Sequence, residues 1–330
     1  MAILVTGASG IIGVNITKLL AEQGRNVVAF DRRKLPAKPD ILGHVMDYVT
    51  AETGNVVDWS QVLHVIKSHH VNGIIHCAAI LGKDANRFPL EAININMVGS
   101  ANMLEAARIM GLGRVLIVSS SGVVGWPKDL VTPRKEEEIV LPSLGLYPLT
   151  KLACEHLTYT YRQIYGVDAI SVRPRGVYGP APTETAEAHA NPIWQLVLDA
   201  AAGKPIRRET GGDGAWDLTY AKDCAKGIVQ AYDCKSPSYH VYNLSYGKNT
   251  KISTICGVLK ELFPDLPIEV GPGPWGIDPA KRKPGDLTFE SPLRPPQDIT
   301  RARTDFGFEP EWPVERAIPD WVQWLKVQKP

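Results

Sequence analysis

The sequence has few cysteines, almost no net charge and no long apolar run. Its five cysteines are scattered, without the C-x-x-C spacing typical of zinc sites, at Cys77, Cys154, Cys224, Cys234 and Cys256. Scattered cysteines with apolar or helical neighbours indicate buried thiols in a reducing compartment. No metal site is therefore expected.

Charge and hydropathy also exclude two classes of partner. The formal net charge is +1 over 330 residues, so no basic surface for nucleic acid or an anionic membrane is expected. No apolar run reaches the roughly 18 residues that cross a bilayer. The first residues, MAILVTGASG, carry no basic segment, so no signal peptide is expected either. These features predict a cytoplasmic protein whose partner is a small-molecule substrate.

What the sequence does contain is a regular alternation of two patterns. It is 44% hydrophobic and 22% charged, as ordinary globular proteins are. Short aliphatic runs alternate with segments of helical periodicity. We expect strands at 2–7, 26–31, 71–79, 113–121 and 167–174, and helices at 11–24, 58–70, 96–111 and 147–166. This alternation predicts an α/β fold with a Rossmann-type, doubly wound parallel sheet.

A glycine-rich segment, VTGASGIIG, joins the first expected strand to the first expected helix. It places Gly7, Gly10 and Gly13 where the backbone must turn sharply and approach a diphosphate, whose charge the free amides at the helix start can bind. The spacing is G-x-x-G-x-x-G and departs from the G-x-G-x-x-G fingerprint. The prediction of a dinucleotide site therefore rests on the position of the segment between strand and helix.

An acidic residue at the end of the second expected strand bears on the choice of cofactor. Asp31 lies 18 residues after Gly13 (31 − 13), near the roughly 20 expected of a carboxylate that binds the adenosine ribose. A carboxylate there repels a 2′-phosphate, which favours NAD and makes NADP the less expected cofactor. Arg32 and Arg33 weaken this preference, because an arginine just after the strand can bind that phosphate.

The character of the sequence changes after residue 174, where proline and glycine become frequent and helices shorter. We expect residues 1–174 to form an NAD-binding Rossmann domain. Residues 175–330 are predicted to form mostly a smaller C-terminal substrate-binding lobe, with residues 220–245 returning to the first domain.

The segment YPLTK places Tyr147 four residues before Lys151, on one face of an expected helix. Tyrosine is a poor base at neutral pH because its ordinary pKa is about 10, but a nearby ammonium and an oxidised nicotinamide would stabilise the phenolate. Tyr147 would then remove a hydroxyl proton while hydride passes to NAD. Ser121, at the end of the expected strand 113–121, would hydrogen-bond the same oxygen.

In the content and order of its motifs, the chain resembles the extended short-chain dehydrogenases/reductases. The resemblance is to their NAD-dependent epimerase/dehydratase group, which includes UDP-glucose 4-epimerase. The motifs span nearly the whole chain and are VTGASGIIG, GIIHCAA, NMVGS, SSSGVVG, YPLTK, SVRPRGVYGP, GDGAWDLTYAKD and KPGD followed by DITRARTDFGFEP.

The resemblance implies a catalytic triad of Ser121, Tyr147 and Lys151. It also implies a homodimer formed through helices 96–111 and 147–166. Expected cofactor contacts are Gly7, Gly10, Ile11, Ile12, Gly13, Asp31, Arg32, Asn55, Val56, Cys77, Ala78, Ala79, Asn96, Tyr147, Lys151 and Pro174. Asn55 stands where the family usually has aspartate, and its amide can still bond the adenine amino group.

Departures from the family pattern concern the substrate. Gly176 replaces the asparagine of an R-P-x-N motif, and Trp216 replaces the arginine of an R-D-F motif that binds the diphosphate. Losing that arginine removes a charge-assisted contact worth about 1.5–3 kcal/mol. Asn191 and Arg282 remain at nucleotide and diphosphate positions. The substrate contacts we expect are Leu81, Ser121, Arg175, Asn191, Trp216 and Arg282.

Arg175 is an added cation at the end of the expected strand 167–174. It can bind a substrate carboxylate in bidentate fashion, or it can be a structural arginine paired with an acid such as Glu184 or Glu187. The residues alone leave both alternatives open.

Two enzymatic hypotheses follow, and we place first an NAD-dependent oxidoreductase that interconverts a secondary alcohol and a ketone. Its substrate would be small, polar and sugar-like or acidic, as the lost diphosphate arginine and Arg175 indicate. The alternative is a nucleotide-sugar (UDP-sugar) 4-epimerase with retained NAD, which Asn191 and Arg282 favour. Dehydration is disfavoured, because Gly122 and Val123 replace the Asp-Glu pair of dehydratases. A catalytically silent NAD-binding regulator is disfavoured because the triad is complete.

Overall fold

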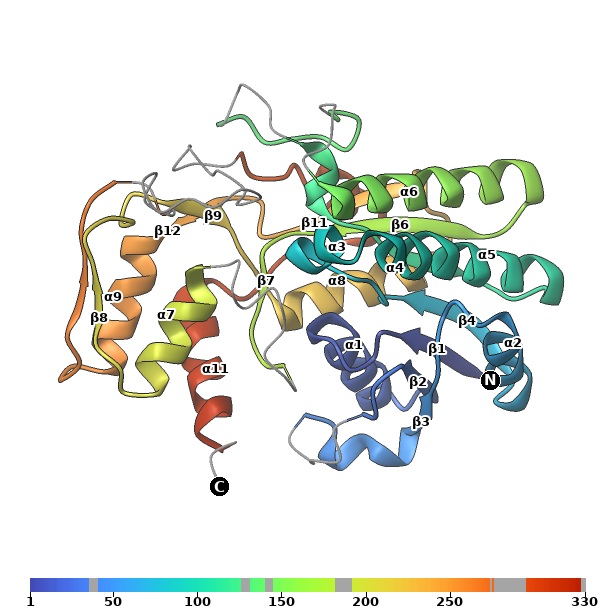
Figure 1. Cartoon of the computed structure of the whole chain (residues 1–330), viewed down its shortest axis with the longest axis horizontal. Helices are drawn as coiled ribbons and strands as arrows, with labels where there is room; N and C mark the ends of the chain where they lie inside the picture. The colour runs from blue at the N-terminus through green and yellow to red at the C-terminus, as the bar shows by residue number, and fades with distance from the viewer. Residues whose placement is uncertain are drawn as a thin grey trace.

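The centre of the protein is a seven-stranded parallel sheet with strand order β11-β6-β5-β4-β1-β2-β3 (Figure 1). The computed structural model describes residues 1–35, 41–125, 131–139, 145–181, 192–273, 275 and 295–327. The sheet strands are β1 (Ala2–Thr6), β2 (Val27–Asp31), β3 (Val49–Thr53), β4 (Val71–His76), β5 (Val115–Val118), β6 (Ala169–Pro174) and β11 (Val241–Leu244). This is the predicted α/β, doubly wound arrangement.

Helices cover both faces of the sheet because its strands are apolar on both sides. All five residues of β1 are buried: Ile3 and Val5 belong to the core shared with α1 and α8, and Ala2 and Leu4 to the core shared with α2, α5 and α6. The helices along the sheet are α1 (Ile11–Glu22), α2 (Trp59–Ser68), α5 (Gly99–Met110), α6 (Leu146–Tyr165) and α8 (Ala221–Asp233). The continuous aliphatic runs of the sequence are therefore explained by double-sided burial.

The expected helices are present, with one difference ahead of α5. Asp58 caps α2, its side chain accepting the N–H of Gln61, and α6 ends at Gly166 in the left-handed conformation (φ 68°). The helix predicted at 96–111 is preceded by α3 (Gly82–Arg87), α4 (Pro89–Ile93) and the π-helical turn η2 (Asn94–Val98). Helical structure thus begins earlier than the pattern indicated.

The strand β3 was not predicted. Its sequence, VTAET, has one buried residue, Val49, and otherwise exposed or half-buried ones, because β3 is the edge strand next to β2. The strand predicted at 113–121 is shorter than expected and ends at Val118. Ser121 begins the 3-10 turn η3 (Ser121–Val124), three residues after β5.

A second core lies beside the carboxyl-terminal edge of the sheet. It is built from α7 (Pro192–Ala201), α9 (Ile252–Leu262) and α11 (Val314–Val327), which lie together at the left of Figure 1. Trp194 packs edge-on against Trp321 at its centre, with ring centroids 4.6 Å apart. Short strand pairs surround it: β7 (Val177–Tyr178) with β10 (Thr219–Tyr220), β9 (Ala215–Asp217) with β12 (Asn249–Lys251), and β8 (Ile206–Arg208) with β13 (Ile268–Val270).

Later parts of the chain also pack on the sheet. The strand β11 pairs with β6, α8 packs beside α1, and α10 (Thr300–Phe306) leads to Phe308, which is buried in the sheet core. The remaining short element is the 3-10 turn η1 (Gly43–Tyr48). The division at residue 174 into an NAD-binding domain and a substrate-binding lobe stays a proposal.

Two absences hold for the described part of the chain. None of its helices is long and apolar enough to cross a membrane. No group of three or more His, Cys, Asp or Glu side chains in it is arranged to hold a metal ion.

Candidate active site

A cavity of about 570 Å³ lies along the carboxyl ends of β1, β2, β4 and β5 and reaches the start of α6. This is the edge at which open α/β sheets bind their ligands. The predicted cofactor residues line it, with the exceptions of Asn96 and Pro174: Gly7, Gly10, Ile11, Ile12, Gly13, Asp31, Arg32, Asn55, Val56, Cys77, Ala78, Ala79, Tyr147 and Lys151. The structure therefore brings most of the sequence-predicted residues into one space.

The glycine segment is shaped for close approach of its backbone to a ligand. Gly7 has a φ of +66°, and a Cβ there would lie 2.6 Å from the amide nitrogen of Ala78; a Cβ on Gly13 would lie 2.3 Å from the carbonyl oxygen of Gly7. No side chain caps the start of α1 after Gly10. The first amides of α1 are therefore left for an anion, which fits a dinucleotide diphosphate.

Asp31 is tied to the glycine segment. Its Oδ2 accepts the N–H of Ser9 at 2.9 Å and its Oδ1 the N–H of Arg33 at 3.0 Å, and only 7% of the residue is exposed. Arg32 turns to Glu91 of α4, with which it forms an ion pair at 2.8 Å. Arg33 also lines the cavity, and its guanidinium lies 3.7 Å from the Asp31 carboxylate, so each arginine after β2 has an acidic neighbour.

Asn55 and Val56 follow β3 and line the same end of the cavity. The Oδ1 of Asn55 accepts the N–H of Val57 at 3.1 Å, and its backbone N–H donates to Gln61 at 2.8 Å. The loop is therefore fixed beside the cavity, and the adenine contact of Asn55 stays a prediction.

Tyr147 and Lys151 lie at the other end of the cavity, one helical turn apart on α6. The Lys151 ammonium is 5.9 Å from the centroid of the Tyr147 ring and donates to the carbonyl oxygen of Val118 at 2.7 Å. Only 2% of Lys151 is exposed. A buried, fixed cation beside the phenol is the arrangement that stabilises a phenolate.

The end of β4 beside Lys151 stays uncharged. Burial, together with the positive charge of Lys151, lowers the pKa of His76 to about 3, and His76 Nδ1 lies 2.7 Å from the hydroxyl of Thr6. Burial raises the pKa of the Cys77 thiol to about 12 against the opposing effect of Lys151. Cys77 is therefore a protonated packing group at neutral pH and no nucleophile.

Three consecutive serines follow β5, and they differ in their contacts. Ser119 lines the cavity and donates to Glu155 of α6 at 2.5 Å. Ser120 Oγ accepts the N–H of Gly122 at 3.1 Å, and Gly122 faces Pro148, the residue after Tyr147. Neither Ser120 nor Ser121 lines the cavity. The sequence pattern predicts Ser121 as the catalytic serine, but three consecutive serines cannot be told apart by pattern alone. The contacts of Ser120 make it a second candidate.

Asn96 does not reach the cavity, although its side chain stabilises the wall. It is fully buried, exchanges hydrogen bonds with the backbone of Ile80 at 2.7 and 3.0 Å, and donates to Thr150 of α6 at 2.9 Å. Asn96 thereby joins the loop after β4 to the helix that carries Tyr147 and Lys151.

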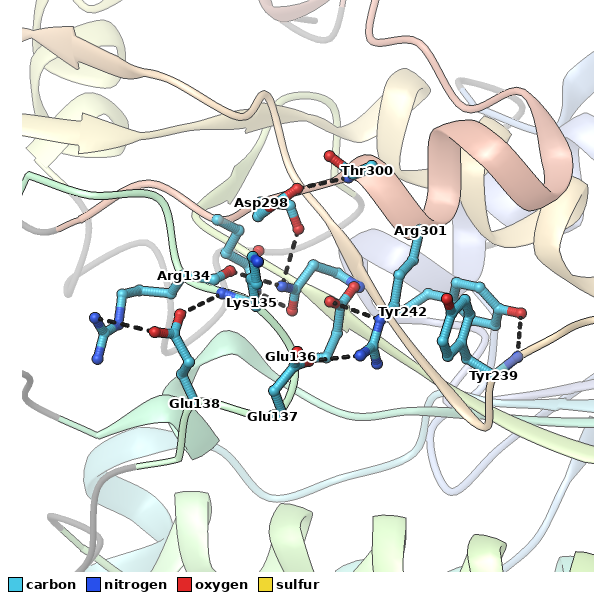
Figure 2. Close-up of polar contacts among 12 residues, drawn as sticks. Arg134, Lys135, Glu136, Glu137, Glu138, Tyr239, Tyr242, Asp298, Thr300 and Arg301 are labelled. Carbon is cyan, nitrogen blue, oxygen red and sulfur yellow. Dashed lines mark hydrogen bonds and ion pairs between the residues drawn. The ribbon is translucent and has the colours of Figure 1, made fainter.

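A buried ionic network lies behind the serines. Arg173 of β6 donates to both carboxylate oxygens of Glu155, at 2.8 and 2.7 Å, and to the carbonyl oxygen of Glu136 at 2.7 Å. Figure 2 shows the next link, Arg301 of α10 reaching Glu136 and Glu137. The network connects α6 to β6, to residues 131–139 and to α10.

The predicted substrate residues are more dispersed. Leu81 lines the cavity, whereas Arg175 and Trp216 do not. Arg175 directly follows β6, and Trp216 is half-buried in β9. Asn191 and Arg282 lie outside the described residues.

Comparison with known proteins agrees with this geometry. Residues 3–245 match the model of the NAD dependent epimerase/dehydratase family. The chain is 26% identical to a UDP-glucuronate 4-epimerase of Thermodesulfobacterium geofontis, covering 98% of this chain and 95% of that protein. It is 27% identical to a putative UDP-glucose 4-epimerase of Methanocaldococcus jannaschii, covering 98% of each.

Solved structures share the fold. A UDP-glucose 4-epimerase from Thermotoga maritima superposes with a TM-score of 0.80 at 23% identity, covering 99% of each chain. A partial consensus L-threonine 3-dehydrogenase superposes with a TM-score of 0.80, also at 23% identity, covering 99% of this chain and 100% of that one.

Proposed function

Because the chain belongs to the NAD-dependent epimerase/dehydratase family, we propose that it oxidises and re-reduces one carbon of a UDP-sugar, as a 4-epimerase. The observation that carries this proposal is that one cavity has the glycine segment at one end and the Tyr147–Lys151 pair at the other. The relatives named as UDP-glucuronate and UDP-glucose 4-epimerases support the nucleotide sugar.

Bound NAD supplies a carbon that accepts and returns a hydride. In our mechanism Tyr147 removes the proton of the substrate hydroxyl as the carbonyl forms, and returns it on reduction. Lys151 stabilises the phenolate through its charge, fixed by the bond to Val118, and the nicotinamide ribose is its expected second contact. A serine hydroxyl after β5 orients the reacting oxygen. Cofactor contacts come from the glycine segment, Asp31 and the loop at Asn55.

A second candidate is the dehydrogenase on a small polar or acidic substrate that the sequence analysis placed first. Trp216 favours it, because a tryptophan at this position offers a diphosphate no positive charge. The relatives support the epimerase better, so we rank the dehydrogenase second.

Thermal unfolding of the NAD-loaded protein with millimolar UDP separates the two candidates. A ligand at 100 times its Kd stabilises by about 2.7 kcal/mol, which raises the Tm by a few degrees for a chain of this length. We expect such a shift for the epimerase. A shift with NAD but none with UDP would reject the nucleotide-sugar substrate and favour the dehydrogenase.

A further inference from the structure

Arg175 is the first residue after β6. In the sheet β6 lies next to β5, the strand that leads to the cavity-lining Ser119. Neighbouring strands are about 4.8 Å apart, so Arg175 leaves the sheet one strand away from the Tyr147–Lys151 end of the cavity. The backbone there is fixed, since the carbonyl of Gly176 accepts the N–H of Thr219 and β7 pairs with β10.

The charge nearest to Arg175 is Asp217, and this carboxylate already has other partners. It accepts the hydroxyl of Ser245 at 2.7 Å and the backbone N–H groups of Gln297 at 2.9 Å and Gly247 at 3.2 Å. Burial lowers the pKa of the Arg175 guanidinium, and the charge of Asp217 opposes that shift. Asp217 thus balances the charge of Arg175 without taking up its hydrogen-bond donors.

Across the residues that the structure describes, the Arg175 side chain makes no hydrogen bond and no ion pair within 4 Å. A guanidinium carries five N–H donors. The Arg175 side chain is half-buried and none of its nitrogen atoms is a buried atom without a partner, so its donors are open to solvent and to a ligand. A guanidinium whose charge is compensated but whose donors make no internal hydrogen bond can bind an anionic ligand. Among the described residues no acid forms a salt bridge with Arg175; Glu184 and Glu187, the acids named in the structural alternative, lie outside them.

We propose that Arg175 binds a carboxylate of the substrate, so that the substrate is a sugar acid, free or as a uronic acid attached to UDP. The inference rests on the proposed function and narrows its substrate class. A planar carboxylate matches the guanidinium in bidentate fashion. In a hexuronic acid the carboxylate carbon C6 is bonded to C5, the neighbour of C4. The carboxylate would therefore lie near the reacting carbon, and Arg175, which does not itself line the cavity, leaves the sheet one strand away from that end.

The diphosphate is a less suitable ligand for Arg175. Successive side chains of a strand point to opposite faces, so Trp216 and Asp217 face opposite sides of β9. Trp216 occupies the position of the lost diphosphate arginine, whereas Arg175 lies on the side of Asp217. Arg175 therefore does not stand in for the missing arginine.

The test uses two pairs of compounds that differ only in the oxidation state of C6: UDP-glucose with UDP-glucuronate, and galactose with galacturonate. Turnover with NAD is measured for the wild type, Arg175→Gln and Arg175→Lys. We expect the wild type to prefer the acid of one pair, and Arg175→Gln to reduce the ratio of kcat/KM for acid over neutral roughly 10- to 100-fold. Arg175→Lys should retain part of the preference.

Arg207→Gln is the matched control, since Arg207 is an exposed arginine of β8 in the same lobe. It should leave the ratio unchanged, and the NAD affinity of Arg175→Gln should equal that of the wild type. If the wild type turns over both members of a pair without preferring the acid, the inference is wrong. It is also wrong if Arg175→Gln lowers kcat/KM equally for the acid and the neutral compound. An equal loss of kcat/KM together with weaker binding of UDP itself would assign Arg175 to the diphosphate. If the wild type turns over none of the four compounds, both the proposed function and the assignment of Arg175 to a substrate carboxylate are rejected.

Discussion

At the scale of single residues, the catalytic hydroxyl after β5 can be assigned by experiment. Ser120 Oγ accepts the N–H of Gly122 beside Pro148, and its own O–H has no acceptor among the described residues. We predict that Ser120→Ala lowers kcat by 10²-fold or more, within the roughly 10²- to 10⁴-fold range of acid–base catalysis that Tyr147→Phe should lose. Ser121→Ala is the matched control, and a larger loss there would restore the assignment made from the sequence.

Tyr147→Phe itself should abolish turnover while NAD still binds. Unchanged turnover of that variant would remove both the epimerase and the dehydrogenase from consideration.

Cofactor choice also depends on single residues. Arg32 forms an ion pair with Glu91, and about half of each side chain is exposed. The pair keeps the Arg32 guanidinium from binding a ligand at the end of β2. Glu91→Gln should free Arg32 for a 2′-phosphate, so we predict a higher ratio of kcat/KM for NADP over NAD. Asp84→Asn removes an equal charge from another residue of the cavity wall and is the control. An equal rise in both variants would show a general electrostatic effect and no specific role for Arg32.

Much of the candidate cofactor site was predictable at this scale because its residues are close in sequence. Gly7 to Gly13 and Tyr147 to Lys151 are local motifs whose spacing fixes their geometry. The acidic neighbour of Arg175 was not predictable. The acids proposed from the sequence were Glu184 and Glu187, which lie outside the described residues. The structure places Asp217 near Arg175, 42 residues away in the sequence (217 − 175). Such a contact depends on how β9 folds back, which no local pattern contains.

At the scale of elements, α6 is held against β6 by the Glu155–Arg173 pair. Both side chains are buried, with 5% and 1% exposure. Glu155→Gln leaves Arg173 as a buried, uncompensated charge and weakens the bond to Ser119, so we predict a loss of about 3–5 kcal/mol in the free energy of unfolding. Urea denaturation measures it.

The matched control for that prediction is Glu105→Gln. Glu105 pairs with Arg108 on the surface of α5, and exposed pairs contribute about 0–1 kcal/mol. Equal losses in the two variants would contradict the role of burial in the Glu155–Arg173 pair.

At the scale of elements, the helices and strands that could be predicted from the sequence are those with many buried residues. The doubly buried strands and the long amphipathic helices have clear periodicity, and they were found. The edge strand β3 has a single buried residue and therefore no apolar run, and it was missed. The π-helical turn before α5 was missed as well, because one inserted residue shifts the helical period without changing composition.

At the scale of the whole molecule, the homodimer stays a prediction, and the exposed apolar side chains of α5 and α6 are its candidate contacts. Figure 1 shows α5 and α6 side by side on one flank of the sheet. Large side chains with apolar groups are exposed on these helices: Ile109 by 49%, Tyr159 by 45%, Ile164 by 68% and Tyr165 by 53%. If two copies meet there, burying these groups contributes at roughly 25 cal/mol per Å² of apolar surface.

Charges placed on that flank should therefore separate the copies. We predict that the double variant Ile109→Glu, Ile164→Glu is monomeric in light scattering at a protein concentration where the wild type is dimeric, with unchanged NAD binding. Val327→Glu, an exposed apolar position at the end of α11, is the control and should leave the dimer intact. A monomeric wild type would exclude the dimer outright. A double variant that remains dimeric would place the interface on another face, so that the exposed residues of α5 and α6 would need a different partner.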